Sequence, residues 1–154
     1  MKISKTGLDL IKKYEGFEPL PYLCPAKVPT IGYGATYYID GTKVNMSDDA
    51  ITKEEADDLL KRMVLRYENS VKKYVQSELN QNQFDALVSF TYNLGGGNLK
   101  QSTLLKKINK DPSDESIYFE FMKWNKAGGK ILKGLTKRRA EEAKLYFNKQ
   151  TCIA

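Results

Sequence analysis

Glu15 is a candidate for acid–base chemistry because of the residues that surround it. It follows Tyr14 and stands directly before Gly16, at the end of a stretch with helical spacing. A carboxyl in such a partly apolar setting keeps its proton more readily, which suits a general acid at neutral pH. An acidic residue at a helix end is more often a solvated surface group, so Glu15 alone does not indicate a site.

The composition limits the other groups that could do chemistry. The sequence contains no histidine, and Cys24 and Cys152 are its only cysteines. Structural zinc sites and all catalytic schemes that need histidine are therefore excluded, and we expect no metal and no cofactor. Acid–base chemistry has to come from carboxylates, lysine, tyrosine or cysteine.

The spacing of three residue types makes a stronger pattern than Glu15 does by itself. Cys24 stands nine positions after Glu15, Thr30 stands six positions further on, and Ile-Gly-Tyr-Gly follows at 31–34. This pattern resembles the phage-type lysozymes of glycoside hydrolase family 24, in the branch that has Cys where other members have Asp. The resemblance covers nearly the whole chain, through EGFEPLPYLCPAKVPTIGYG, ITKEEADDLL at 51–60, QNQFDALVSFTYNLG at 81–95 and GGKILKGLTKRRAEE at 128–142.

The resemblance implies muramidase activity, which is hydrolysis of the β-1,4 bond between N-acetylmuramic acid and N-acetylglucosamine in peptidoglycan. It implies that Glu15 is the general acid, that Cys24 takes the place of the usual Asp, and that Thr30 helps to place the attacking water. Cys24 as a thiolate could be a base or stabilise positive charge, but it could also be a small apolar side chain in the wall of the cleft. Tyr92 and Ser102 match positions that contact sugar in the family, although core packing explains Tyr92 equally well.

Three positions depart from the family pattern. Lys27 replaces a common glycine, Pro29 replaces the common aromatic residue before Thr30, and Ala35 stands where many members have histidine. Ala35 removes a structural group and not the proton donor, so it puts local stability and the shape of the cleft in question more than activity. Near the C-terminus, the Arg139 and Glu142 spacing indicates a structural i,i+3 pair on the helix surface rather than an anion site.

Periodicity and capping signals predict a mostly helical chain. A first amphipathic helix should end at Gly16, Asp40-Gly41 should form a hairpin turn, and Thr52 with Glu55 should cap one long helix. Asn80 should cap a helix that is apolar nearly all round, which the glycines at 95–97 should end. Further helices are expected near 102–109, 114–124 and 136–148.

These elements predict a single domain of the α+β class, with a two-lobed lysozyme-like fold. We expect a small β-sheet lobe at about 14–60, a long connecting helix, and a C-terminal helical lobe at about 61–150 that packs with the N-terminal helix. A ligand would then be expected in the cleft between the lobes. The chain contains no long apolar run, so neither a membrane span nor a signal peptide is expected.

The charge balance of the chain favours anionic partners. Lys and Arg outnumber Asp and Glu by 25 to 19, which gives a formal net charge of +6. The expected partner is the glycan strand of peptidoglycan, with no nucleic acid because no nucleic-acid-binding motif accompanies the charge. We expect a monomer without stable membrane insertion, kept in the bacterial cytoplasm until a separate holin releases it. A catalytically inactive module that only binds peptidoglycan is the main alternative.

Overall fold

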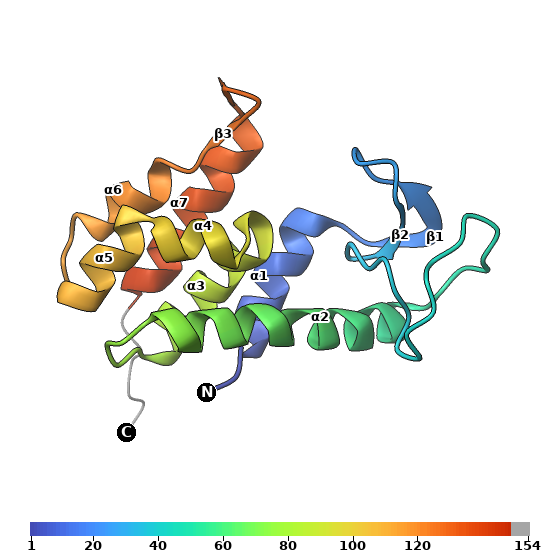
Figure 1. Ribbon diagram of the computed structural model, residues 1–154, viewed down its shortest axis with the longest axis horizontal. Helices are drawn as coiled ribbons and strands as arrows, with labels where there is room; N and C mark the ends of the chain where they lie inside the picture. Colours follow the sequence, from blue (N-terminus) through green and yellow to red (C-terminus); the bar gives the residue numbers. More distant parts are fainter. Residues whose placement is uncertain (149–154) are drawn as a thin grey trace. The chain divides into compact units, whose positions relative to one another are not determined.

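The first helix ends where the sequence predicts. In the computed structural model, which describes residues 1–148, helix α1 spans Lys5–Glu15 (Figure 1). Gly16 follows with φ +73°, a backbone conformation that suits glycine, while its amide still donates to the Lys12 carbonyl at 3.0 Å. The chain therefore leaves the helix directly after Glu15. Residues 149–154, which include Cys152, lie outside the described part.

Helices dominate the rest of residues 1–148, so the predicted mostly helical α+β class is confirmed. The further helices are α2 (Lys53–Tyr74), α3 (Gln81–Leu94), α4 (Gly96–Gln101), α5 (Thr103–Lys110), α6 (Ile117–Met122) and α7 (Lys133–Phe147). Two antiparallel pairs complete the fold, β1 (Glu18–Leu23) with β2 (Pro29–Gly32), and β3 (Lys126–Ala127) with β4 (Lys130–Ile131). None of these helices is long and apolar enough to span a bilayer.

Both predicted capping signals begin helices. At α2 the Glu55 amide donates to the Thr52 hydroxyl at 3.1 Å, and the Thr52 amide donates back to the Glu55 carboxylate at 3.2 Å. At α3 the Gln83 amide donates to the Asn80 side chain at 2.8 Å, and the Asn80 amide donates back to the Gln83 side chain at 2.9 Å. Each pair satisfies two backbone donors that a helix start leaves open, so both helix starts are confirmed.

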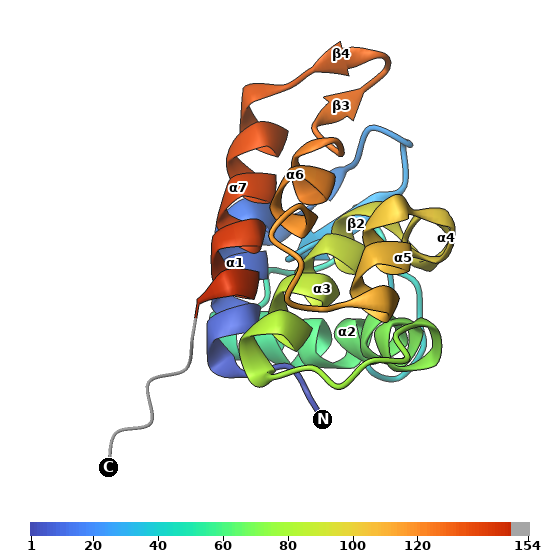
Figure 2. The ribbon, with the colours of Figure 1, turned by 90° about the vertical axis from the view of Figure 1, so that its left-hand side faces the viewer.

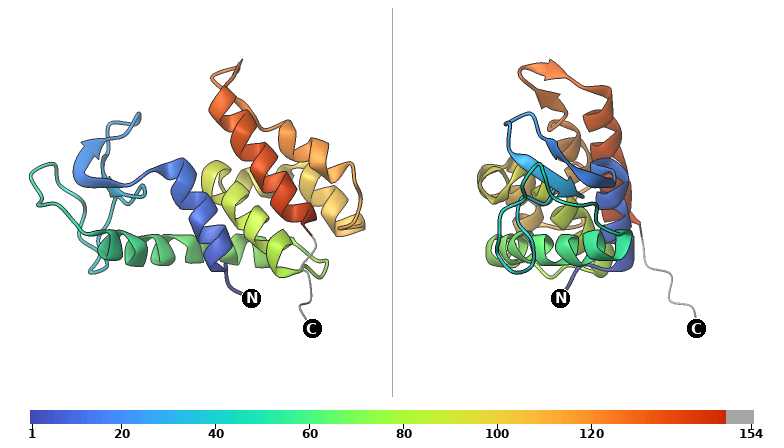
Figure 3. Two further views of the ribbon diagram at one scale, coloured as in Figure 1. Left: turned by 180° about the vertical axis from the view of Figure 1, so that it is seen from behind. Right: turned by 90° about the vertical axis from the view of Figure 1, so that its right-hand side faces the viewer.

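The chain divides into two compact units. The hairpin unit is Asp9–Arg66, and the helical unit consists of Met1–Leu8 and the chain from Tyr67 onward. In the helical unit α3 is buried nearly all round, as its apolar pattern predicts. Helix α7 packs against α3, and α6 packs against α7 (Figures 2 and 3). Phe90 of α3 meets Phe121 edge to face at 5.6 Å between ring centroids.

The hairpin unit has a small core of its own. Ile31, Ala35, Val44 and Leu59 are buried together there, with Tyr38, Ile51 and Met63 packed against them. The turn predicted at Asp40-Gly41 is present, because the Gly41 amide donates to the Tyr38 carbonyl at 3.0 Å. The strands expected on either side of it are reduced to an isolated bridge between Tyr37 and Lys43.

Two elements were not predicted from the sequence. The glycines at 95–97 end α3, but Gly96 also begins the short helix α4 at once. The β3–β4 hairpin occupies a stretch between two expected helices. The helix α4 is short, and the hairpin rests on a Gly-Gly turn and backbone pairing, so apolar periodicity gives no signal for either of them.

Candidate active site

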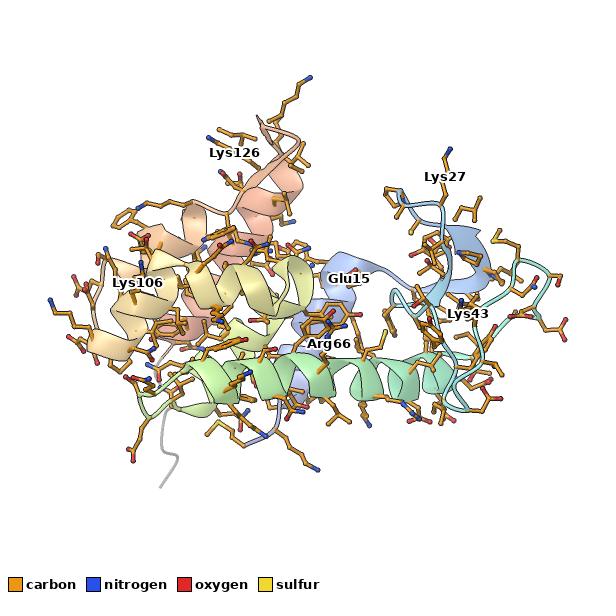
Figure 4. The ribbon with its side chains drawn as sticks, viewed as in Figure 1. Glu15, Lys27, Lys43, Arg66, Lys106 and Lys126 are labelled. Carbon is orange, nitrogen blue, oxygen red and sulfur yellow. The ribbon has the colours of Figure 1, made fainter. Side chains whose placement is uncertain are left out.

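Glu15, Cys24 and Thr30 all belong to the hairpin unit. Glu15 is the last residue of α1 and is half-buried there (Figure 4). Its carboxylate lies close enough to the Tyr22 phenol to act on it electrostatically. The predicted proton donor is therefore within electrostatic range of the strand that leads to Cys24.

The turn between β1 and β2 positions Cys24. The Lys27 amide donates to the Cys24 carbonyl at 2.7 Å, and the Cys24 amide donates to the Val28 carbonyl at 3.2 Å. Lys27 has φ +61° and is the one non-glycine residue of the described chain with a positive φ. A turn followed by a left-handed residue is a common three-residue hairpin connection, and it favours glycine at this position. The positive φ at this position therefore explains why glycine is common there in the family, and Lys27 adopts the same φ at a cost in strain.

Thr30 is held in one orientation on β2. It is only 3% exposed, and its hydroxyl donates to the Val28 carbonyl at 2.8 Å. Its register partner across the strand pair is Tyr22. A β-branched side chain has few rotamers, so the strand and this hydrogen bond together fix the direction of the hydroxyl oxygen.

Cys24 is a half-buried free thiol whose environment favours the thiolate. The pKa of Cys24 is lowered, chiefly by hydrogen bonding from the Val28 backbone, with partial desolvation opposing it. Smaller contributions come from the Ala26 backbone and from the Thr30 hydroxyl. The contribution of Thr30 places its hydroxyl within interaction range of the Cys24 sulfur, while the hydroxyl proton is directed to the Val28 carbonyl.

Tyr22 is a residue of this region that the sequence reasoning missed. The pKa of its phenol is raised by burial, and further by the charges of Glu15, Glu18 and Cys24. The phenol therefore stays a neutral hydrogen-bond donor at physiological pH. The alternation of side chains along an extended chain puts Tyr22 and Cys24 on the same side, and this signal could have found it.

The other two departures from the family pattern are accommodated locally. Pro29 is the first residue of β2, a strand position where the missing amide proton costs little. Ala35 is fully buried and exchanges two backbone hydrogen bonds with Ile31, at 2.8 and 2.9 Å. The residue at position 35 is therefore part of the core of the hairpin unit.

The helical unit contains Tyr92, whose ring packs on a tyrosine of α2. Tyr92 is half-buried, and its ring meets that of Tyr67 edge to face at 5.1 Å between centroids. One part of the ring is thus used in packing while another part is exposed. The substrate-binding role of Tyr92 stays a prediction.

Ser102 has a structural role in the same unit. It is 2% exposed, accepts a hydrogen bond from the Leu105 amide at 3.0 Å, and donates one to the Leu99 carbonyl at 2.7 Å. Ser102 thereby caps the N-terminus of α5. The predicted sugar contact is not tested by this geometry, but the hydroxyl proton is already used.

The charged residues of α7 are buried, whereas the sequence predicted a surface pair. Arg139 and Glu142 are fully buried and lie 3.1 Å apart, and Arg138 approaches the same carboxylate at 3.3 Å. Ser89 of α3 donates to Glu142 at 2.6 Å, and Asn93 accepts from Arg139. The i,i+3 spacing and the structural role are confirmed, but the surface placement is wrong because α3 covers this face of α7.

The hairpin unit therefore combines a carboxyl, a thiol of lowered pKa and a fixed hydroxyl. A carboxyl can protonate the leaving oxygen of a glycoside, and a hydroxyl with a nearby thiolate can orient a water molecule. Within residues 1–148 no three His, Cys, Asp or Glu side chains gather in a way that could hold a metal ion. The chemistry available to this group of residues is acid-assisted hydrolysis.

Comparison with known proteins connects this site to one family. A family model described as "Phage lysozyme" matches residues 12–142. The endolysin of Bacillus phage B103 is 42% identical over 149 residues, which cover 96% of this chain and 54% of that protein. The endolysin of Acyrthosiphon pisum secondary endosymbiont phage 1 is 40% identical over 151 residues, which cover 95% of this chain and 98% of that protein.

A solved structure of the same kind shares the fold. A mutant of the lysozyme of phage P22 superposes with a TM-score of 0.87 at 34% identity, covering 96% of this chain and 99% of that one. The predicted lysozyme-like fold is therefore confirmed. The chain spans about half the length of the Bacillus phage endolysins that it matches.

Proposed function

Since the chain belongs to the phage lysozyme family, we propose that it hydrolyses the β-1,4 bond between N-acetylmuramic acid and N-acetylglucosamine in peptidoglycan. The observation that supports this most is the presence of Glu15, Cys24 and Thr30 in one compact unit, at a helix end and on one strand pair. The relatives named endolysin and lysozyme support the same activity. The biological role is lysis of a bacterial cell by a phage or prophage.

In this reaction Glu15 protonates the leaving oxygen. A glycosidic oxygen is a poor leaving group, so the proton has to arrive as the bond breaks. The end of α1 holds the Glu15 carboxyl half-buried and within electrostatic range of the Tyr22 phenol.

Thr30 and Cys24 act on the water that attacks the sugar. The Thr30 proton is directed to the Val28 carbonyl, so the Thr30 oxygen accepts a hydrogen bond from water and turns a water lone pair outward. The lowered pKa of Cys24 allows its thiolate to act as the base. Attack by water on the face opposite the leaving group inverts the anomeric carbon, and no sugar becomes attached to the sulfur.

The cellular setting of the proposal follows the same family. The enzyme acts as a monomer on glycan strands, with Tyr92 and Ser102 as sugar contacts. It accumulates in the host cytoplasm, and a separate holin lets it reach the wall. It uses no cofactor.

Product analysis tests the proposed bond specificity. Purified peptidoglycan is digested, the new reducing ends are reduced with borohydride, and the sugars are hydrolysed and identified. Reduced muramic acid is expected to appear in proportion to digestion. Reduced glucosamine, or new amino groups without new reducing sugars, would show that a different bond is cut.

The inactive alternative predicts a different result in the same assay. A module that only binds peptidoglycan would sediment with the insoluble material and release no reducing ends at any enzyme concentration. A fall in turbidity of chloroform-permeabilised Gram-negative cells, together with reduced muramic acid, is expected for the active enzyme.

A further inference from the structure

The β3–β4 hairpin of the helical unit is a small projection (Figure 2). Gly128 and Gly129 form its turn with φ values of +58° and +78°, which is the geometry of the two-residue turns that favour glycine. At its base the Leu132 amide donates to the Asn125 carbonyl at 3.0 Å, and the Asn125 side chain donates to Thr136 at 3.1 Å. These two hydrogen bonds tie the base of the hairpin to the N-terminal end of α7.

The surface of this hairpin is both basic and apolar. Every residue from Lys126 to Gly134 is exposed, including Ile131 at 65% and Leu132 at 44%. Lysines occur at 123, 126, 130, 133 and 137, and the sequence has no acidic residue between Glu120 and Glu141. Figure 4 shows Lys126 on the projecting hairpin. We call residues 126–133 the basic hairpin.

Neither feature of the basic hairpin serves the stability of the fold. Lys133 is the first residue of α7, and a positive charge at a helix N-terminus is unfavourable because the helix dipole is positive there. Ile131 and Leu132 leave much of their apolar surface in water. A binding partner that takes both cations and apolar side chains explains the combination better than folding does.

We propose that the basic hairpin binds reversibly to the surface of an anionic phospholipid membrane. Lysine ammonium groups bind headgroup phosphates, while exposed aliphatic side chains enter the boundary between headgroups and acyl chains. The carboxylates of peptidoglycan would also attract lysines, but a hydrated glycan and its peptides offer no apolar layer for Ile131 and Leu132. This contact is peripheral, and it does not depend on hydrolysis of the glycan.

A lipid-binding experiment with matched charge variants tests the electrostatic part. The full chain is floated with vesicles of phosphatidylglycerol and phosphatidylethanolamine, and separately with phosphatidylcholine vesicles. The wild type is expected to bind only the anionic vesicles, and the triple variant Lys126→Gln, Lys130→Gln, Lys133→Gln is expected to bind them more than about tenfold more weakly. The control changes three exposed lysines elsewhere, Lys43→Gln, Lys61→Gln, Lys106→Gln, with an expected loss below about threefold.

A second pair of variants tests the apolar part. Ile131→Ser with Leu132→Ser keeps every charge and is expected to weaken binding to anionic vesicles at physiological salt severalfold. Leu65→Ser, at a 50% exposed position of α2, is the control and should leave binding unchanged. Because all these side chains are exposed, thermal melts of each variant should match the wild type within a few degrees.

Three results would overturn the proposal. The first is equal losses from the two lysine triples, since the net charge alone would then explain binding. The second is full vesicle binding by the Ile131 and Leu132 variant. The third is a hairpin triple that binds vesicles normally but loses sedimentation with purified peptidoglycan, which would assign the hairpin to the wall. Release of reducing sugars from soluble glycan fragments is expected to be unchanged in every variant, which separates this test from that of the hydrolytic function.

Discussion

The backbone amide of Lys27 donates a 2.7 Å hydrogen bond to the carbonyl of Cys24, and this bond closes the turn that positions the Cys24 thiol. The turn requires Lys27 to adopt a φ of +61°. The position of a candidate catalytic group thus depends on a residue in a conformation that only glycine adopts without strain.

Replacing Lys27 by glycine is expected to stabilise the protein. A left-handed conformation costs a side-chain-bearing residue about 1–2 kcal/mol, and relief of this strain should exceed the about 0.4–1 kcal/mol by which glycine favours the unfolded chain. We expect Lys27→Gly to raise the free energy of unfolding by about 0.5–1 kcal/mol in urea titrations. Lys43→Gly, at an exposed position with ordinary φ, should lower it by a similar amount, and the same loss in both variants would contradict the strain argument.

Glu15→Gln is expected to abolish most of the lytic activity. The amide has the size of the carboxyl but no proton to deliver, and a positioned general acid contributes about 10²–10⁴ in rate. The measurement is the initial fall in turbidity of permeabilised cells at equal enzyme concentration. Glu18→Gln, an exposed carboxyl on β1, serves as the control and should keep full activity. Activity of Glu15→Gln within about tenfold of wild type would remove Glu15 from the mechanism.

Substitutions at Cys24 distinguish a catalytic base from a side chain that only lines the cleft. If the thiolate acts on water, Cys24→Asp should keep substantial activity and Cys24→Ala should lose most of it. Mass spectrometry of the wild type with substrate should find no sugar on the sulfur. Full activity of Cys24→Ala would show that Cys24 only fills space in the lining of the cleft, while a trapped glycosyl adduct would show that it is a nucleophile.

The lowered pKa of Cys24 predicts its reactivity as a function of pH. Alkylation by iodoacetamide requires the thiolate, so a lower pKa moves the midpoint of the rate profile to lower pH. In a Cys152→Ser background, the midpoint for the folded protein should lie below that of the same protein in urea. Thr30→Val removes one contributing hydroxyl and should move the midpoint part of the way back. Coincident folded and unfolded profiles would contradict the environment described for the thiol.

Glu142 is expected to be essential for stability. Its removal leaves Arg138 and Arg139 buried without their carboxylate, and breaking a buried ion pair in this way costs about 3–5 kcal/mol. Glu142→Gln should therefore show a large drop in the urea midpoint, and Glu115→Gln, at an exposed position, should change it little. Ser89→Ala is a milder variant that should cost about 1–3 kcal/mol by removing the 2.6 Å bond to Glu142. Stability unchanged by both Glu142→Gln and Ser89→Ala would show that the buried cluster contributes nothing.

The sequence by itself determined the helices that begin and end with local signals. Thr52 with Glu55 and Asn80 with Gln83 cap helices because both partners lie within one turn of each other, so three or four residues contain the whole interaction. The spacing from Glu15 to Cys24 and Thr30, with the family resemblance it supports, likewise indicated the candidate site from the order of residues alone. These features depend on neighbours in the chain.

The tertiary structure alone decided which face of each element is covered. The spacing of Arg139 and Glu142 is the same on a surface helix and on a buried one, and only the packing of α3 against α7 makes this pair part of the core. Ser102 looks the same in sequence whether its hydroxyl caps a helix alone or also binds a ligand, and the bond to Leu99 shows where its proton goes. The positive φ of Lys27 follows from the register of the β1–β2 pair. The exposure of Ile131 follows because no other segment of the described chain covers its side chain. Burial arises from contacts between segments far apart in the chain, and such contacts leave no local periodicity to read.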